Sequence, residues 1–62
     1  MTQVTEHYCV EEYSDEIYMV YRVTDLVSDP RATGIKGKQA ATDIAFIFEM
    51  MENKLENLND KS

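Results

Sequence analysis

The chain has 62 residues, one cysteine, one histidine and a formal net charge of -6 at pH 7. A chain this short builds one thin core, and it has neither two cysteines for a disulfide nor four Cys and His ligands for a structural zinc ion. We therefore expect a single domain over residues 1–62 that is stabilised by tight packing or by a second copy, and we favour a homodimer.

The first part of the chain predicts a β-hairpin. Residues 3–12 and 16–24 are rich in Val, Ile, Tyr and Thr, which suit a pleated surface, and a Ser-Asp pair between them favours a turn. A two-residue loop here would pair Val10 with Met19, although the lack of an Asn-Gly or Asp-Gly pair leaves a longer loop open. The predicted hairpin spans residues 3–24, and its apolar face consists of Val4, Tyr8, Val10, Ile17, Met19, Tyr21 and Val23.

Residues 25–36 predict a turn-rich connection. This segment contains an Asp-Pro dipeptide and a glycine, which punctuate secondary structure. A short third strand at residues 25–27 stays open. We expect Leu26, Val27 and Ile35 to tuck under the helix that follows.

Residues 37–58 predict one long amphipathic helix, the only segment long enough to anchor a core. With 3.6 residues per turn, its apolar residues form one stripe. This stripe is expected to pack across the apolar face of the hairpin, which gives an α+β fold of order ββα, and the polar residues 59–62 are expected to fray. The stripe consists of Ala40, Ile44, Ile47, Met51, Leu55 and Leu58, with Ala41 and Phe48 at its edge.

Acidic residues dominate both ends of the chain. Residues 1–30 carry seven acids and one base and residues 39–62 five acids and two bases, whereas residues 31–38 carry three bases and no acid. Direct nucleic-acid binding is therefore not expected, and the expected partner is a protein with a basic or neutral surface. Carboxylates on alternate strand residues lie about 6.6 Å apart, comparable to phosphates along a nucleic-acid strand, so an acidic hairpin tip could mimic DNA. The carboxylates of this tip are Glu11, Glu12, Asp15 and Glu16.

Four large residues are candidates for contact with another protein chain. Tyr13 and Tyr18 fall on the mixed face of the predicted hairpin, which is more apolar than a solvated face requires. Phe46 and Met50 are four residues apart on the side of the predicted helix away from its main stripe. Such residues are enriched in interfaces, so we expect Phe46 and Met50 to mark where a second chain docks.

The chain shows no motif for catalysis or for a bound group. His7, Cys9 and Glu11 alternate along one strand face, but this spacing is not a standard metal-ligand pattern. The segment TGIKGKQ has glycines and lysines before a helix but departs from a P-loop at both key positions. One histidine and a thin core leave no plausible Ser-His-acid set, so we expect no enzyme activity, no cofactor and no metal.

The small size, acidity and lack of catalytic groups resemble the general class of phage or mobile-element inhibitors of host proteins. The leading hypothesis is a small acidic protein-interaction module, a viral-type inhibitor that occupies a surface of a larger host protein, with DNA mimicry as one route. Two alternatives stay open. One is a small dimeric nucleic-acid-associated regulator that uses Arg31, Lys36 and Lys38, and the other is an accessory subunit of a larger assembly.

The sequence also predicts where the protein is found. No apolar run approaches the roughly 18 residues of a membrane span, and no basic-then-apolar signal segment opens the chain. A lone thiol fits a reducing compartment. We therefore expect a cytoplasmic protein without membrane contact.

Overall fold

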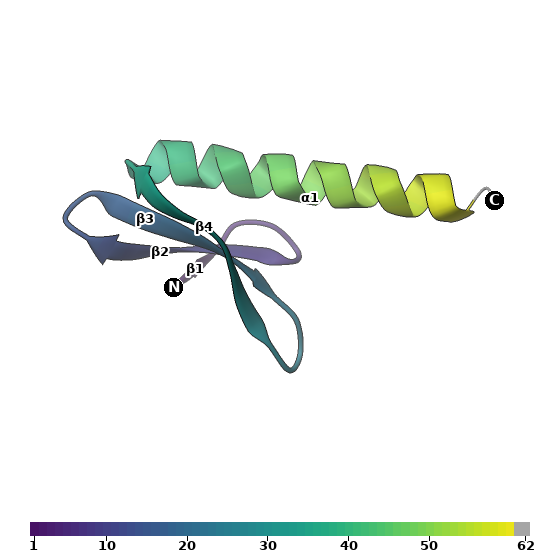
Figure 1. Cartoon of the computed structure of the whole chain (residues 1–62), viewed down its shortest axis with the longest axis horizontal. Helices are drawn as coiled ribbons and strands as arrows, with labels where there is room; N and C mark the ends of the chain where they lie inside the picture. Colours follow the sequence, from purple (N-terminus) through teal and green to yellow (C-terminus); the bar gives the residue numbers. More distant parts are fainter. Residues whose placement is uncertain (61–62) are drawn as a thin grey trace.

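A four-stranded antiparallel sheet with one long helix on one of its faces makes up the fold (Figure 1). The computed structural model describes residues 1–60 and the side chains of residues 1–56. Neighbouring strands pair in chain order, β1-β2-β3-β4. The predicted α+β class is confirmed, with four strands in place of two. The elements are β1 (Thr2–Gln3), β2 (Tyr8–Ser14), β3 (Ile17–Val23), β4 (Ser28–Lys36) and α1 (Lys38–Asp60).

The predicted hairpin is present as β2 and β3, but its predicted register is wrong by one residue. Val10 pairs with Val20, not with Met19. A bulge near the end of β2 moves the turn onto Asp15 and Glu16, and Glu16 adopts a φ of 60°. A glutamate seldom takes a positive φ, which is why residue preferences alone did not indicate this turn.

The register shift exchanges the two faces of β3. Tyr18 and Val20 face α1 together with Arg22, whereas Met19 and Tyr21 lie on the open face of the sheet. A slip of one residue turns every side chain of a strand to the other face. The predicted apolar face is therefore correct for β2 and wrong for β3.

The predicted connecting loop over residues 25–36 is also wrong, because most of it forms β4. This strand lies at the edge of the sheet, where Pro30 needs no N–H for a neighbour on the outer side. Gly34 takes a φ of 70°, which a bend in the strand requires. Leu26 and Val27 lie in the loop before β4 and are 95% and 58% exposed, so they do not tuck under the helix. Ile35 of β4 is partly buried and packs against the core, as expected.

Helix α1 runs from Lys38 to Asp60, close to the predicted range 37–58. Gly37 connects β4 to the helix with a φ of 92°, and its carbonyl accepts a hydrogen bond from the Ala41 N–H. The tail that we expect to fray comprises residues 59–62, and the helix includes the first two of them. Residues 61–62 lie outside the described residues. A helix of 23 residues is about 34 Å long, and its C-terminal half extends past the sheet (Figure 1).

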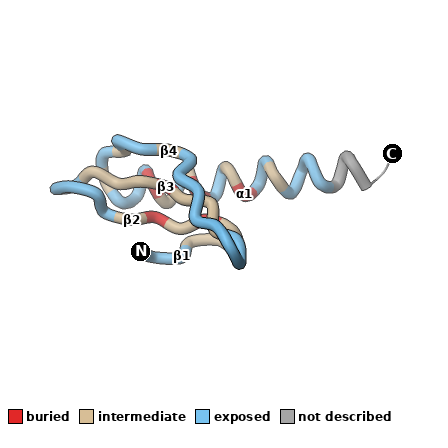
Figure 2. Tube along the Cα trace, turned by 60° about the horizontal axis from the view of Figure 1, so that its bottom comes forward, coloured by how far each residue is buried: buried red, intermediate tan, exposed pale blue. Residues whose placement is uncertain are grey.

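The predicted rotation of the helix is correct in part, because Ala41, Ile44 and Phe48 pack on the core as expected, but the sheet-facing side is centred on other residues. Ala41 and Ala45 face the sheet and are fully buried, whereas Ile47 of the predicted stripe is 52% exposed. Leu58 falls among the residues whose side chains are not described. Figure 2 places the buried residues in the middle of the sheet and in the first half of α1. The buried apolar core consists of Tyr8, Val10, Val20, Ala41 and Ala45.

Candidate functional site

Glu49 of α1 is buried against the turn that precedes β2, and both of its carboxylate oxygens contact residues of that turn. Its Oε1 accepts hydrogen bonds from the Thr5 hydroxyl at 2.9 Å and from the His7 backbone N–H at 2.8 Å. Its Oε2 lies 2.8 Å from His7 Nδ1. The carboxylate therefore ties the middle of the helix to a segment more than 40 residues away in the chain.

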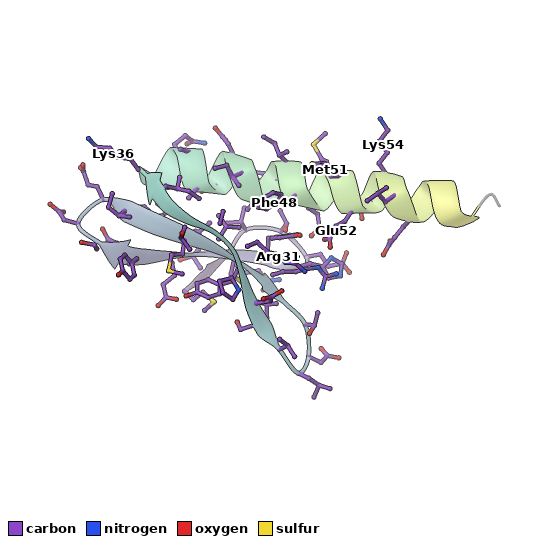
Figure 3. The ribbon with its side chains drawn as sticks, viewed as in Figure 1. Arg31, Lys36, Phe48, Met51, Glu52 and Lys54 are labelled. Atoms are coloured by element: carbon purple, nitrogen blue, oxygen red, sulfur yellow. The ribbon has the colours of Figure 1, made fainter. Side chains whose placement is uncertain are left out.

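A second ion pair lies one helical turn further along. Arg22 of β3 donates a hydrogen bond from Nε to Glu52 Oε1 (Figure 3 labels Glu52). Glu52 Oε2 is buried without a hydrogen-bond partner within the described part of the chain. The four residues His7, Arg22, Glu49 and Glu52 are called the polar tether below.

The pKa values of the tether reflect these contacts. The hydrogen bond to Glu49 raises the pKa of His7 above its ordinary value of 6.5. Burial raises the pKa of Glu49, but hydrogen bonds from His7 and Thr5 outweigh it and hold that pKa below the ordinary 4.5. The hydrogen bond to Glu52 raises the pKa of Arg22. Each shift favours the charged form that the tether needs.

A metal ion has no clear place in this cluster. His7, Glu49 and Glu52 each offer one ligand atom, and these atoms lie within 4.8 Å of one another. However, His7 Nδ1 is already engaged by Glu49, and Glu52 already holds the guanidinium of Arg22. A divalent cation would have to displace a proton from the histidine and sit beside a fixed positive charge, so the geometry favours a structural role.

The tether fixes the rotation of the helix about its own axis. Because Glu49 and Glu52 point to the sheet, the residues on the other side of α1 point away from it. Figure 3 shows Phe48 and Glu52 directed to the sheet and Lys54 directed away from it. Five large apolar side chains of the helix are left between 49% and 68% exposed. This surface, called the outward face below, consists of Phe46, Ile47, Met50 and Met51. Leu55, seven residues after Phe48, lies on the same side as Phe48 and is exposed where the helix extends past the sheet.

Two of the predicted contact residues, Phe46 and Met50, lie on this outward face. Tyr13 is 72% exposed near the tip of the hairpin. Tyr18 is partly buried and packs against the core, because the register places it under the helix. The structure therefore does not bring the four predicted contact residues together.

The acidic tip does not form one row of carboxylates. Glu11 pairs with Met19 and Glu12 with Tyr18, so the two glutamates project from opposite faces of the sheet. The Glu12 carboxylate accepts a hydrogen bond from the backbone N–H of Glu16 at 3.3 Å. The tip is therefore an acidic turn in which Glu11 and Glu12 do not share one face of the sheet.

The basic residues of the predicted regulator surface are also spread out. Arg31 lies 3.3 Å from Asp29 in an ion pair and lines a shallow hollow with Tyr8 and Phe48. Lys36 ends β4 near the start of α1, well away from Arg31 in Figure 3. Arg31 therefore lies apart from Lys36 and Lys38, which flank Gly37 at the junction of β4 and α1.

The polar tether was not predicted from the sequence. Glu49 and Glu52 are three residues apart, which puts them on one side of a helix, and the chain has one histidine and few bases to pair with them. That spacing was the available signal. Hydrophobic periodicity, which treats a glutamate as solvent-facing, leaves Glu49 and Glu52 outside the stripe that it assigns to the core.

Comparison with protein-family models, with curated proteins and with solved structures found no match. Among the described residues, no helix is long and apolar enough to cross a membrane. The function must therefore be inferred from the geometry of the chain itself.

Proposed function

We propose that this chain is a small acidic protein-interaction module that binds another protein chain through the outward face of α1. One observation carries the proposal: among the described side chains, the helix exposes five large apolar ones, as many as there are residues in the buried apolar core. Apolar area left in water costs about 25 cal/mol per Å², and contiguous exposed patches of this kind mark contact sites.

Other surfaces support this choice by being less suited to binding. One edge of the sheet is β4, where Pro30 and charged residues such as Arg31 discourage pairing with another strand. The other edge is β1, which has only two residues. The open face of the sheet carries Met19 and Tyr21, but both are partly buried by their neighbours. The outward face of α1 is the more accessible apolar surface.

The charge of the chain limits the kind of partner. A net charge of -6 favours a protein with a basic or neutral surface over nucleic acid. A cytoplasmic location and inhibition of a larger host protein are part of this proposal, and the chain bound at the outward face is either a second copy, which makes a homodimer, or a different protein. DNA mimicry by the acidic tip receives less support, since Glu11 and Glu12 project from opposite faces.

Site-specific photo-crosslinking tests the proposal in cells that express the chain. A photo-reactive residue replaces Met50 on the outward face, Tyr13 at the hairpin tip, or Asp25 as an exposed control. We expect covalent adducts with a protein, either a second copy or another chain, from position 50 and not from position 25. Adducts from position 13 alone would move the binding surface to the hairpin and contradict the proposal.

A further inference from the structure

A row of four residues runs along the part of α1 that points away from the sheet. Asp43, Ile47, Met50 and Lys54 are separated by four, three and four residues, the spacing that aligns side chains along the seam of paired helices. All four are exposed. The row is about 16 Å long, and it has an acid at one end, a base at the other and two large apolar residues between them.

This row is complementary to itself when two copies run antiparallel. A two-fold axis midway between Ile47 and Met50 places Ile47 of one copy against Met50 of the other, twice. The same operation places Asp43 of each copy opposite Lys54 of the other. Every member of the row then meets a residue that suits it: apolar against apolar and acid against base.

A parallel arrangement lacks this match. It would place Asp43 opposite Asp43 and Lys54 opposite Lys54, so that like charges face each other at both ends of the row. The two charges are also free for such a contact. Within residues 1–56, the Asp43 carboxylate accepts one side-chain hydrogen bond, from the exposed amide of Gln39 at 2.9 Å. In the same range, Lys54 has no carboxylate partner.

The flanks of the row extend the contact. Phe46 lies on one side of it and Met51 on the other, and both are about half exposed or more. A standard interface buries about 800 Å² on each partner, which is roughly a sixth of the 4647 Å² surface of this chain. A helix that extends past its own sheet leaves room for a second helix along its length (Figure 1).

We propose that the occupant of the outward face is a second copy of this chain, paired antiparallel through the row Asp43, Ile47, Met50 and Lys54. This inference rests on the proposed function, because it names the partner of the same surface. It also explains how a chain of 62 residues with a small core covers its exposed apolar side chains.

Charge reversal tests the pairing and its direction by sedimentation equilibrium. We expect the wild-type mass to rise with concentration from 7.2 kDa towards twice that value. Asp43→Lys and Lys54→Glu should each weaken dimerisation about tenfold, because each puts like charges together at two symmetric places. The double variant should recover to within about threefold of the wild type. Glu56→Lys makes the same charge change on the same helix off the row, and it should leave dimerisation within about twofold.

Three results would overturn the inference. The first is a wild-type chain that stays at 7.2 kDa at about 1 mM. The second is a double variant as weak as the single variants, and the third is a Glu56→Lys variant as weak as Asp43→Lys. Far-UV circular dichroism checks that every variant keeps its helix. If the wild type is monomeric while position 50 still crosslinks to a different protein, the homodimer fails and the proposed function stands; if neither occurs, both fail.

Discussion

Replacing Ala45 by leucine should destabilise the chain strongly, because its side chain is enclosed between the helix and the sheet. The Ala45 side chain is fully buried against the core. Extra carbon atoms in a well-packed core cost about 1–3 kcal/mol of unfolding free energy, since neighbouring groups must shift to make room. A domain of this size has a total unfolding free energy of about 3–9 kcal/mol.

The matched control is Ala40→Leu. Ala40 lies on the same helix, is exposed, and belongs to the stripe that periodicity predicted to face the sheet. Alanine and leucine have similar helix propensities, so this change should alter the unfolding free energy by less than about 0.5 kcal/mol.

Urea unfolding followed by circular dichroism at low micromolar protein measures both variants. Repeating the titration at a second protein concentration separates any contribution of a dimer, because that contribution depends on concentration. The melting temperature of Ala45→Leu should also fall, by about 4–8 °C for each kcal/mol lost. A neutral Ala45→Leu together with a destabilising Ala40→Leu would show that the helix is rotated as periodicity predicts, and our account of the tether would be wrong.

The remaining predictions concern the tether and the turns. The pKa of Glu49 is lowered in the folded chain, so its contribution to stability is present above pH 4.5 and is lost as the pH falls through its folded pKa. The pKa of His7 is raised in the folded chain, so its contribution is complete below pH 6.5 and is lost as the pH rises through its folded pKa. The unfolding free energy should therefore be highest between about pH 4.5 and 6.5, and His7→Gln should remove the loss on the alkaline side, as a series of urea titrations would reveal. Glu16→Gly should raise the melting temperature, because glycine adopts a positive φ without strain, and the unfolding free energy should rise by up to about 1 kcal/mol. The control Asp15→Gly, at a neighbour outside the left-handed region, should lower the melting temperature. Equal shifts for the two variants would argue against strain at Glu16. Gly37→Ala should lower the unfolding free energy by about 1–2 kcal/mol, because alanine is strained at a φ of 92°. No atom lies within 4 Å of the added carbon, so a steric clash does not contribute. An unchanged urea midpoint would contradict this backbone conformation.

Part of the fold was predictable because local patterns specify it. The long apolar periodicity placed the helix within two residues of its observed ends. The β-branched and aromatic runs indicated the β2–β3 hairpin. The register was lost because a bulge and a positive φ at Glu16 move the turn by one residue, and neither has a signature in this sequence. Pro30 and Gly34 indicated a loop, yet an edge strand tolerates both.

The candidate site was less predictable, for a different physical reason. Periodicity assigns the most apolar side of a helix to the core. In this chain Glu49 and Glu52 occupy part of the sheet-facing side of α1, because they pair with His7 and Arg22. Two buried alanines occupy the rest of the contact between the helix and the core. Of the apolar residues that periodicity assigned to the core, Ile47 and Met51 are thereby turned outward, whereas Ile44 and Phe48 still pack against the core. Phe46 and Met50 were identified as exposed, but Ile47 was assigned to the core.

An isotope-filtered NOE experiment tests the central claim, the contact of two outward faces, most directly. A mixture of ¹³C-labelled and unlabelled chains reports only contacts between copies. We predict cross-peaks between the Ile47 δ1 methyl of one copy and the Met50 ε methyl of the other, since the antiparallel row places them face to face. Intermolecular cross-peaks from Met19 and Tyr21 on the open face of the sheet, with none from Ile47 or Met50, would contradict the account.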